Sequence, residues 1–231
     1  MKIGIIGSGN IGGALARRFR AAGHDVAIAN SRGPASLLDL ARETGARPVA
    51  IGEVVHGVDL VVVAIPLVNV ASLPAHLFAD TAAGLIVVDT SNYYPRERDG
   101  RIAEIEAGTT ESGWVERRIG HRVVKAFNSI IAPHLLENGR PAGTPGRIAL
   151  AVAGDDTGQK AVVTTLLDDI GFDAVDAGTI AESWRQQPGT PGYLRDFDTA
   201  GVRVALQQAS RERTAQWTAT DASPGTFDSP A

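Results

Sequence analysis

The strongest constraint on the fold is a glycine motif that directly follows an apolar run at the start of the chain. The motif Gly7-Ser8-Gly9-Asn10-Ile11-Gly12 lies between the strand-like run 2–6 and a helical pattern over 11–22. A second strand-like run, 26–29, comes next. A GxGxxG motif in this β-α-β context is typical of dinucleotide-binding units, in which the glycines allow a tight turn, close approach of a pyrophosphate and close helix–strand packing. The helix N-terminus then presents unpaired N–H groups to the phosphates.

We therefore predict that a dinucleotide binds at six consecutive residues: Gly7, Ser8, Gly9, Asn10, Ile11 and Gly12. The alternative is a glycine-rich turn of a parallel sheet that holds no ligand. The strand, the glycines, the helix and the second strand follow one another in the order and spacing of known dinucleotide sites, which favours a dinucleotide site here.

The end of the second strand indicates which dinucleotide binds. Sites for NAD usually place Asp or Glu there to bind the ribose 2′-hydroxyl. This chain reads Asn30-Ser31-Arg32-Gly33-Pro34 instead, so no carboxylate repels a 2′-phosphate. Ser31 can donate a hydrogen bond and Arg32 can form a charge-assisted pair with the phosphate. We predict NADP(H) as the cofactor; the alternative for Arg32 is an ordinary solvated loop arginine.

Composition excludes several classes of function. The net charge is −4 and no long basic run occurs, so we expect neither nucleic acid nor an acidic membrane as a partner. Cysteine is absent, and the five histidines are scattered, so we expect no metal site. Met1 leads straight into the first strand and no apolar stretch is long enough to cross a bilayer, so we expect a cytoplasmic protein.

Strand-like and helix-like segments alternate along the chain, which predicts an α/β fold. We expect a Rossmann-like, doubly wound, mostly parallel sheet with a small C-terminal α/β extension. The expected strands are 2–6, 26–29, 48–50, 60–65, 85–89, 123–127, 147–153 and 173–176. The expected helices are 11–22, 35–44, 51–56, 68–78, 160–170 and 195–213. Pro74 either interrupts the helix 68–78 or is tolerated in it, and residues 101–107 and 130–137 are either short helices or loops.

The same alternation suggests three parts of the chain. Residues 1–122 form the dinucleotide-binding domain, and residues 123–215 form an extension that completes a cleft for the acceptor. Residues 216–231 are rich in Thr, Ser, Asp and Pro and are expected to be a mobile tail. The alternative for the tail is docking on a partner subunit.

In doubly wound sheets, ligands bind beyond the carboxyl ends of the strands. Ala64, Ile65 and Pro66 follow the fourth strand and are expected to form an apolar wall against the adenosine or the nicotinamide ribose. Asn92 follows the fifth strand and is expected near the nicotinamide. A loop over 183–193 combines aromatics, amides and tight turns, and is either a lid over the cleft or a plain surface loop.

Lys125 and Asn128, at the end of the sixth strand, are the candidate catalytic residues. An unpaired ammonium within an apolar strand is costly, so Lys125 either faces the ligand or pairs with a carboxylate such as Asp89. Asn128 either orients a carboxamide or carbonyl group, or is a turn residue whose hydrogen bonds are satisfied locally.

Together these segments resemble the NADPH-dependent reductases of coenzyme F-420, a deazaflavin, and the cytosolic reductase domain of the six-transmembrane ferric reductases is similar. The resemblance rests on 2–12, 30–34, 64–66, 89–92, 124–128 and 153–156 and covers about residues 1–180. It implies hydride transfer between the nicotinamide and a stacked acceptor ring, with a deazaflavin or flavin as co-substrate, and it implies a homodimer. Members of the family often carry a histidine in the loop where this chain has Asn128.

Two other functions stay open at this point. One is an NADPH-dependent reductase of a small carbonyl or imine substrate, and the other is a non-catalytic NADP(H)-binding sensor. The chain has no Tyr-x-x-x-Lys pair of the short-chain dehydrogenase kind. Hydride transfer between two rings needs chiefly their juxtaposition, so few proton-transfer groups are needed for it.

Overall fold

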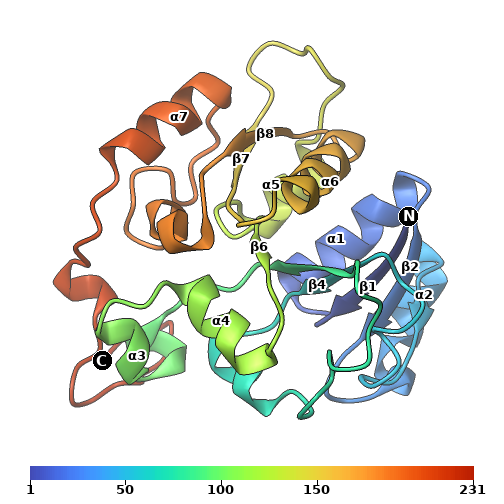
Figure 1. The fold of residues 1–231 in the computed structure, drawn as a ribbon, viewed down its shortest axis with the longest axis horizontal. Helices are drawn as coiled ribbons and strands as arrows, with labels where there is room; N and C mark the ends of the chain where they lie inside the picture. The colour runs from blue at the N-terminus through green and yellow to red at the C-terminus, as the bar shows by residue number, and fades with distance from the viewer.

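A six-stranded parallel sheet forms the centre of the molecule (Figure 1). The computed structural model describes residues 1–231. The strands of this sheet are β1 (Lys2–Ile6), β2 (Asp25–Ala29), β3 (Arg47–Pro48), β4 (Leu60–Val63), β5 (Ile86–Asp89) and β6 (Val124–Lys125). Their spatial order is β3-β2-β1-β4-β5-β6, the doubly wound order of Rossmann folds. The expected fold class is therefore confirmed.

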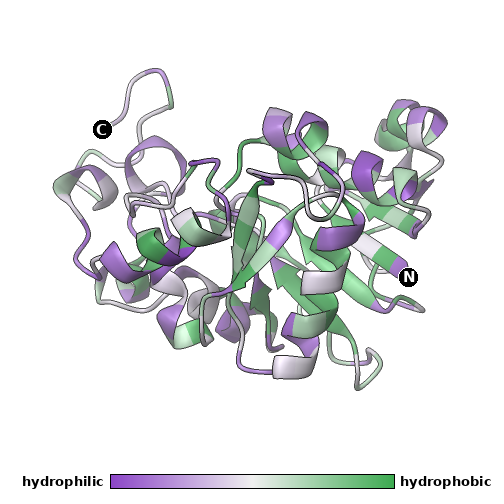
Figure 2. Cartoon of the chain, turned by 90° about the horizontal axis from the view of Figure 1, so that it is seen from above, coloured by the Kyte–Doolittle hydropathy of each residue, from purple (hydrophilic) through white to green (hydrophobic).

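The sheet is apolar on both faces because neighbouring side chains of each strand enter different cores. In β4, Val62 belongs to a core cluster of 27 residues, while Val61 and Val63 belong to a second cluster of 21 residues on the other face. Parallel strands covered on both faces read as continuous β-branched runs, as this one does. Figure 2 shows these strands as the hydrophobic centre, with the hydrophilic residues mostly on the surrounding helices and loops.

Helices connect and cover the strands. The α-helices are α1 (Asn10–Ala21), α2 (Leu38–Thr44), α3 (Ala103–Glu106), α4 (Glu111–Ile119), α5 (Ala132–Glu137), α6 (Thr157–Asp169) and α7 (Thr199–Gln208). Shorter helical segments are η1 (Pro34–Leu37), η2 (Leu67–Ser72), η3 (Pro95–Asp99), η4 (Ile180–Gln186) and η5 (Ala215–Trp217). Side chains of Thr110, Asp156 and Asp198 cap α4, α6 and α7 by accepting a backbone N–H three residues on.

Several expected helices differ from the structure. Residues 51–56 form turns rather than a helix. The Glu53 side chain accepts the backbone N–H of Ala50. A helix of six residues that includes a glycine forms too few hydrogen bonds to offset the free-energy cost of nucleation. The expected helix 68–78 is the 3₁₀ helix η2, which ends before Pro74. The last helix spans Thr199–Gln208 and is shorter than expected. Helix α4 was missed, although its capping Thr110 and its left-handed Gly120 are ordinary end signals.

The C-terminal extension is a second, smaller sheet joined to the first. Strands β7 (Ala149–Val152) and β8 (Asp173–Asp176) pair in parallel, and a single antiparallel bridge links Lys125 of β6 to Ala153. Leu150 and Val152 belong to the same 27-residue core as β1 and α1. The extension thus shares the core of the dinucleotide-binding part, and the division at residues 122 and 123 stays a prediction.

The last residues lie against the segment that follows β5. The backbone N–H groups of Gly225 and Ala231 both donate to the carbonyl oxygen of Arg96, and the Phe227 ring meets Tyr94 edge-on with centroids 5.5 Å apart. The C-terminus accordingly lies beside α3 in Figure 1. Whether residues 216–231 are mobile in solution stays a prediction.

None of the helices has both the length and the apolar character that a membrane crossing requires.

Candidate cofactor-binding site

The glycine loop lies at the point where the strand order reverses, between the carboxyl ends of β1 and β4. Gly7 adopts a φ of 110°, and a Cβ there would lie 2.2 Å from the carbonyl oxygen of Ala64. A Cβ at Gly12 would lie 2.0 Å from the carbonyl oxygen of Gly7. Both glycines are therefore required by close backbone packing within the protein itself.

Gly9 is different, because the space beside it is open. A Cβ at Gly9 would meet no protein atom within 4 Å. Gly9 is the N-cap of α1, no side chain caps this helix end, and no acidic residue lies in its first turn. The first N–H groups of α1 and the positive end of its dipole thus face free space, which is the arrangement that binds phosphate groups.

A cavity of about 790 Å³ opens directly beside this loop. Eight of the residues predicted to bind the cofactor line it: Gly7, Ser8, Gly9, Ser31, Arg32, Ala64, Ile65 and Pro66. They come from three separate loops, which follow β1, β2 and β4. The structure therefore gathers the predicted phosphate, ribose and apolar contacts around one space of the size of a cofactor pocket.

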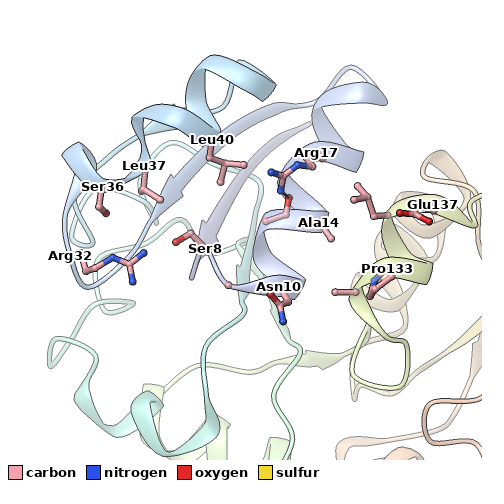
Figure 3. A pocket seen from close by; sticks show the side chains of 14 residues that line it. Ser8, Asn10, Ala14, Arg17, Arg32, Ser36, Leu37, Leu40, Pro133 and Glu137 are labelled. Carbon is pink, nitrogen blue, oxygen red and sulfur yellow. Dashed lines mark hydrogen bonds between the residues drawn. The ribbon is translucent and has the colours of Figure 1, made fainter.

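A second groove of about 580 Å³ runs from the glycine loop to α5 (Figure 3). Asn10 lines it together with Ser8 and Arg32, and Pro133 and Glu137 of α5 face it from the opposite side. The predicted residues Ile11 and Gly12 lie in α1 and line neither space.

Asn30 organises the end of β2. Its Nδ2 donates to the hydroxyl oxygens of Ser8 and Ser36, over 3.0 Å in each case. Its Oδ1 accepts the backbone N–H of Arg32 over 2.9 Å. Asn30 lies at the position where NAD sites carry a carboxylate. The sequence analysis named it only as part of the turn and not as a site residue. Its position directly after β2 could have identified it.

Arg32 is the unpaired cation of the site. Its side chain is exposed and forms no hydrogen bond or ion pair with the protein. Arg17, which lines the neighbouring groove, is instead held by both oxygens of Glu43 over 2.6 Å. That pairing raises the pKa of Arg17, mainly through the hydrogen bond to Glu43. Arg32 is therefore the guanidinium available to an anionic ligand.

The far wall of the main cavity was not predicted from the sequence. This wall comes from the loop after β3 and from η2, and consists of Ala50, Ile51, Asn69, Ser72, Leu73 and Pro74. Residues 51–56 and 68–78 were expected to be helical, so no side chain in them was assigned to the site. Only their irregular course brings them beside the glycine loop.

Asn92 and Asn128 meet at the carboxyl ends of β5 and β6. The Asn128 Nδ2 donates to Asn92 Oδ1 over 3.1 Å and to the carbonyl oxygen of Gln186 over 2.6 Å. Gln186 in turn donates to Asn128 Oδ1 over 2.9 Å. Asn128 is 3% exposed, so its amide is fixed by these partners. Of the two alternatives for Asn128, the structure shows the one in which neighbouring protein groups satisfy its hydrogen bonds.

Lys125 lies within the protein rather than at a cavity. It is completely buried, and its Nζ lies 2.9 Å from the carbonyl oxygen of Ser91, 3.5 Å from Glu111 and 3.9 Å from Asp89. Of the two alternatives for Lys125, the carboxylate pair is thus the one present. Its main partner, Glu111, belongs to the helix that sequence reasoning missed.

The 183–193 loop lies across these strand ends. The hydroxyl groups of Tyr193 and Tyr94 are hydrogen bonded, and the backbone N–H of Leu194 donates to the carbonyl oxygen of Ser129. Burial raises the pKa of both tyrosines, so both rings are neutral. The loop is therefore seated on the segments after β5 and β6, and its role as a lid stays a prediction.

Known proteins with similar sequences and structures include NADP-dependent reductases. Residues 2–93 match the family model for NADP oxidoreductase, coenzyme F420-dependent. A structure of a hypothetical protein from Sinorhizobium meliloti is 33% identical, with 85% of this chain and 95% of that chain covered and a TM-score of 0.69. A structure described as a "putative F420-dependent NADP-reductase" from Arthrobacter sp. FB24 is 28% identical, covers 78% of this chain and 86% of that chain, and has a TM-score of 0.65.

Two curated proteins are also similar to parts of the chain. Putative protein YjhV of Escherichia coli (strain K12) is 48% identical over 80 residues, which are 34% of this chain and 58% of that protein. Metalloreductase STEAP3 of Rattus norvegicus is 29% identical over 183 residues, which are 79% of this chain and 35% of that protein. The matches therefore span less than two thirds of either relative. With the glycine loop, the open helix end and the free Arg32 in place, and with the family model and the similar structures in agreement, the chain belongs to the coenzyme F420-dependent NADP oxidoreductase family.

Proposed function

We propose that the protein is an NADP(H)-dependent oxidoreductase that transfers a hydride between the nicotinamide and a small-molecule acceptor of the deazaflavin or flavin type. The observation that carries the proposal is the gathering of the open helix end at Gly9, the free guanidinium of Arg32 and the apolar wall Ala64–Pro66 around one cavity of about 790 Å³. Family membership supports the same chemistry.

The residues of this cavity fit the cofactor part by part. The N–H groups of α1 beside Gly9 would hold the pyrophosphate, since nothing else caps them. Arg32, with the hydroxyls of Ser8 and Ser31, would hold the 2′-phosphate. Ala64, Ile65 and Pro66 would pack against the adenosine or the nicotinamide ribose. When bound, the cofactor supplies a hydride, and the protein supplies binding and orientation.

The acceptor half of the proposal rests on the carboxyl ends of β5 and β6. These ends lie on the same edge of the parallel sheet as the glycine loop, and Asn92 and Asn128 meet there under the 183–193 loop. We propose that Asn128 is a positioning residue, whose fixed amide shapes the nicotinamide end of the cleft. Lys125 acts indirectly, because its ammonium is buried against Glu111 and holds the strand end in place.

The decisive experiment is NADPH oxidation by the purified protein, followed through the near-ultraviolet absorbance of reduced nicotinamide. The acceptors are a deazaflavin, FMN, FAD, a ferric chelate, a simple quinone and a cyclic imine. Rapid turnover with the deazaflavin or a flavin supports the proposal. Turnover with the imine alone assigns the protein to the reductases of small carbonyl or imine substrates. Saturable NADPH binding without turnover of any acceptor supports an NADP(H) sensor and contradicts the proposal.

We also propose a homodimer. Leu194, Phe197 and Val204, on α7 and the segment before it, keep large apolar side chains exposed to solvent, and a second subunit would cover them. Light scattering at several concentrations measures the mass. A dimer mass in the wild type, reduced to a monomer mass by Val204→Glu, is the expected result, and a monomer mass throughout contradicts it.

A further inference from the structure

A second, smaller cavity lies away from the cofactor site, between α3, α4 and the segment after α7. Its volume is about 220 Å³, and it shares no lining residue with the cavity at the glycine loop. Its walls include Thr109, Trp184, Gln187, Arg211 and Arg213. The space equals about seven water molecules at ~30 Å³ each and is smaller than the pockets that take drug-sized ligands.

Gln187, a residue of the cavity wall, carries an unused hydrogen-bond donor. It is 5% exposed, and its Oε1 accepts a hydrogen bond from Arg213 Nη2 over 2.9 Å. A guanidinium can only donate, so the Gln187 atom that faces it must be the oxygen. The amide nitrogen Nε2 is thereby directed elsewhere, and it is buried without any partner. An unpaired buried donor is costly, which indicates an acceptor that the protein does not itself provide.

Arg213 adds a second unused donor beside the first. Its Nη2 is shared between Glu111 and Gln187, whereas its Nη1 is buried and has no partner. Its guanidinium also lies over the ring of Tyr93, at 5.4 Å from the centroid, within the range of a cation–π contact. The wall of this cavity thus carries two buried donors without a partner, one of them cationic, on two side chains that are hydrogen bonded to each other, and an oxyanion can accept from such groups.

The remaining groups of the cavity agree with an anionic ligand. Arg211 also lines the cavity and is exposed, with one long hydrogen bond of 3.4 Å to the carbonyl oxygen of Gly108. The one carboxylate in the wall, Glu106, is held by Tyr93 and by the backbone N–H of Ala219. The buried Glu111 is held by Arg213 and Lys125. Glu111 is therefore paired with two cations, and Glu106 is hydrogen bonded through its Oε1.

We propose that this cavity binds a small oxyanion, a carboxylate or a phosphate, through Arg213 Nη1, Gln187 Nε2 and Arg211. The site goes beyond the proposed hydride transfer, since none of its residues lines the cofactor cavity. It also gives the segment 211–218 a role, because Arg211, Arg213 and Thr218 bring part of the wall from beyond the last α-helix.

Binding is tested by titration calorimetry of the full chain with acetate, succinate and inorganic phosphate, at an ionic strength held constant with chloride. We expect saturable binding of at least one of these anions. Arg213→Lys keeps a cation for Glu111 but removes the free Nη1, and Arg211→Gln removes the exposed cation. Each variant is expected to weaken binding about tenfold or more, the usual effect of losing one charge-assisted hydrogen bond.

Two control variants separate this site from others. Arg203→Gln removes an exposed arginine of α7 that lines neither cavity, and Arg32→Gln removes the cation of the cofactor site. Arg203→Gln is expected to bind the anion as the wild type does, whereas Arg32→Gln is expected to lose only such anion binding as occurs at the cofactor site. Carboxylate binding without phosphate binding, or the reverse, identifies the class of ligand. The proposal is overturned if no anion binds saturably, or if Arg32→Gln abolishes binding while Arg211→Gln leaves it unchanged. If Arg213→Lys does not fold, Arg211→Gln decides alone.

Discussion

The side-chain amide of Asn30 donates a hydrogen bond to the hydroxyl oxygen of Ser8 over 3.0 Å. This bond ties the end of β2 to the glycine loop after β1. Because Asn30 also holds Ser36 and the backbone of Arg32, one neutral side chain sets the positions of three groups around the proposed phosphate site. The residue is 9% exposed, so these hydrogen bonds are largely shielded from water.

Asn30→Asp should change the cofactor preference. A carboxylate at this place repels a 2′-phosphate and accepts a hydrogen bond from a ribose 2′-hydroxyl, as in NAD sites. We expect the ratio of kcat/KM for NADPH to that for NADH to fall about tenfold or more. Asn138→Asp, which adds the same charge at the end of α5, should leave the ratio unchanged. An unaltered ratio in Asn30→Asp would contradict the assignment of this loop.

Arg32→Gln should weaken NADPH binding selectively. The guanidinium has no partner in the protein, so its removal costs only the contact with the 2′-phosphate. Losing one charge-assisted hydrogen bond of about 1.5–3 kcal/mol corresponds to a ~10–100-fold rise in Kd for NADPH. The Kd for NADH should stay within about twofold, and Arg47→Gln, an exposed arginine outside the cavity, should change neither value. Equal losses for the two cofactors would count against Arg32.

Gly9→Ala should reduce cofactor affinity, whereas Gly12→Ala should reduce the stability of the fold. A methyl at Gly9 meets no protein atom and occupies the space in front of α1, so cofactor affinity should fall while the urea midpoint stays unchanged. A methyl at Gly12 would lie 2.0 Å from the Gly7 carbonyl oxygen, so the fold itself should lose stability. Such overpacking costs about 1–3 kcal/mol. Urea unfolding and cofactor titration of the two variants separate these effects, and a stable Gly12→Ala that binds normally would show that the loop is looser than described.

Lys125→Met should destabilise the protein strongly. It leaves the buried carboxylate of Glu111 with Arg213 as its only cationic partner, and breaking a buried ion pair costs about 3–5 kcal/mol. The matched control is Arg42→Met, which breaks the exposed pair with Asp39 and should cost less than ~1 kcal/mol. Chemical denaturation gives both values. A Lys125→Met variant that unfolds like the wild type yet loses turnover would instead show a direct catalytic role.

Stability should fall as the pH drops below the ordinary histidine value of 6.5 because of His24. Burial and the nearby N-terminal ammonium lower the pKa of His24, partly offset by Asp169. As the pH falls, His24 of the unfolded chain binds a proton before His24 of the folded chain does. The free energy of unfolding therefore keeps its full His24 contribution above pH 6.5 and decreases from pH 6.5 down to the lower pKa of the folded state. His24→Gln should make the urea midpoint less dependent on pH over this range, whereas His56→Gln, at an exposed position, should leave the dependence unchanged. A wild-type slope in His24→Gln would assign the effect to other groups.

The grouping of most of the proposed cofactor-binding residues around one cavity was predictable from the sequence, because it depends on short local patterns. The glycine spacing after β1 and the missing carboxylate after β2 each lie within six residues, and the structure places Gly7, Gly9 and Arg32 around one cavity. The far wall, with Asn69 and Leu73, could not be predicted. It comes from turns whose residues carry no periodic signal, and only packing against the sheet fixes their course.

Charge pairing was decided by the tertiary structure. The sequence indicated that a lysine inside an apolar strand needs a partner, but not that Glu111 would be that partner, since the two residues lie on a strand and on a helix whose contact is set by the core. The same holds for Gln187 and Arg213, which are 26 residues apart and meet only because the chain returns past α4 after α7. The sequence by itself determined the Rossmann-like fold and the cofactor loop, because hydrophobic period and glycine spacing act locally. The contacts at the carboxyl ends of β5 and β6, and the walls of the cavity lined by Gln187 and Arg213, were decided by long-range packing, which no local pattern encodes.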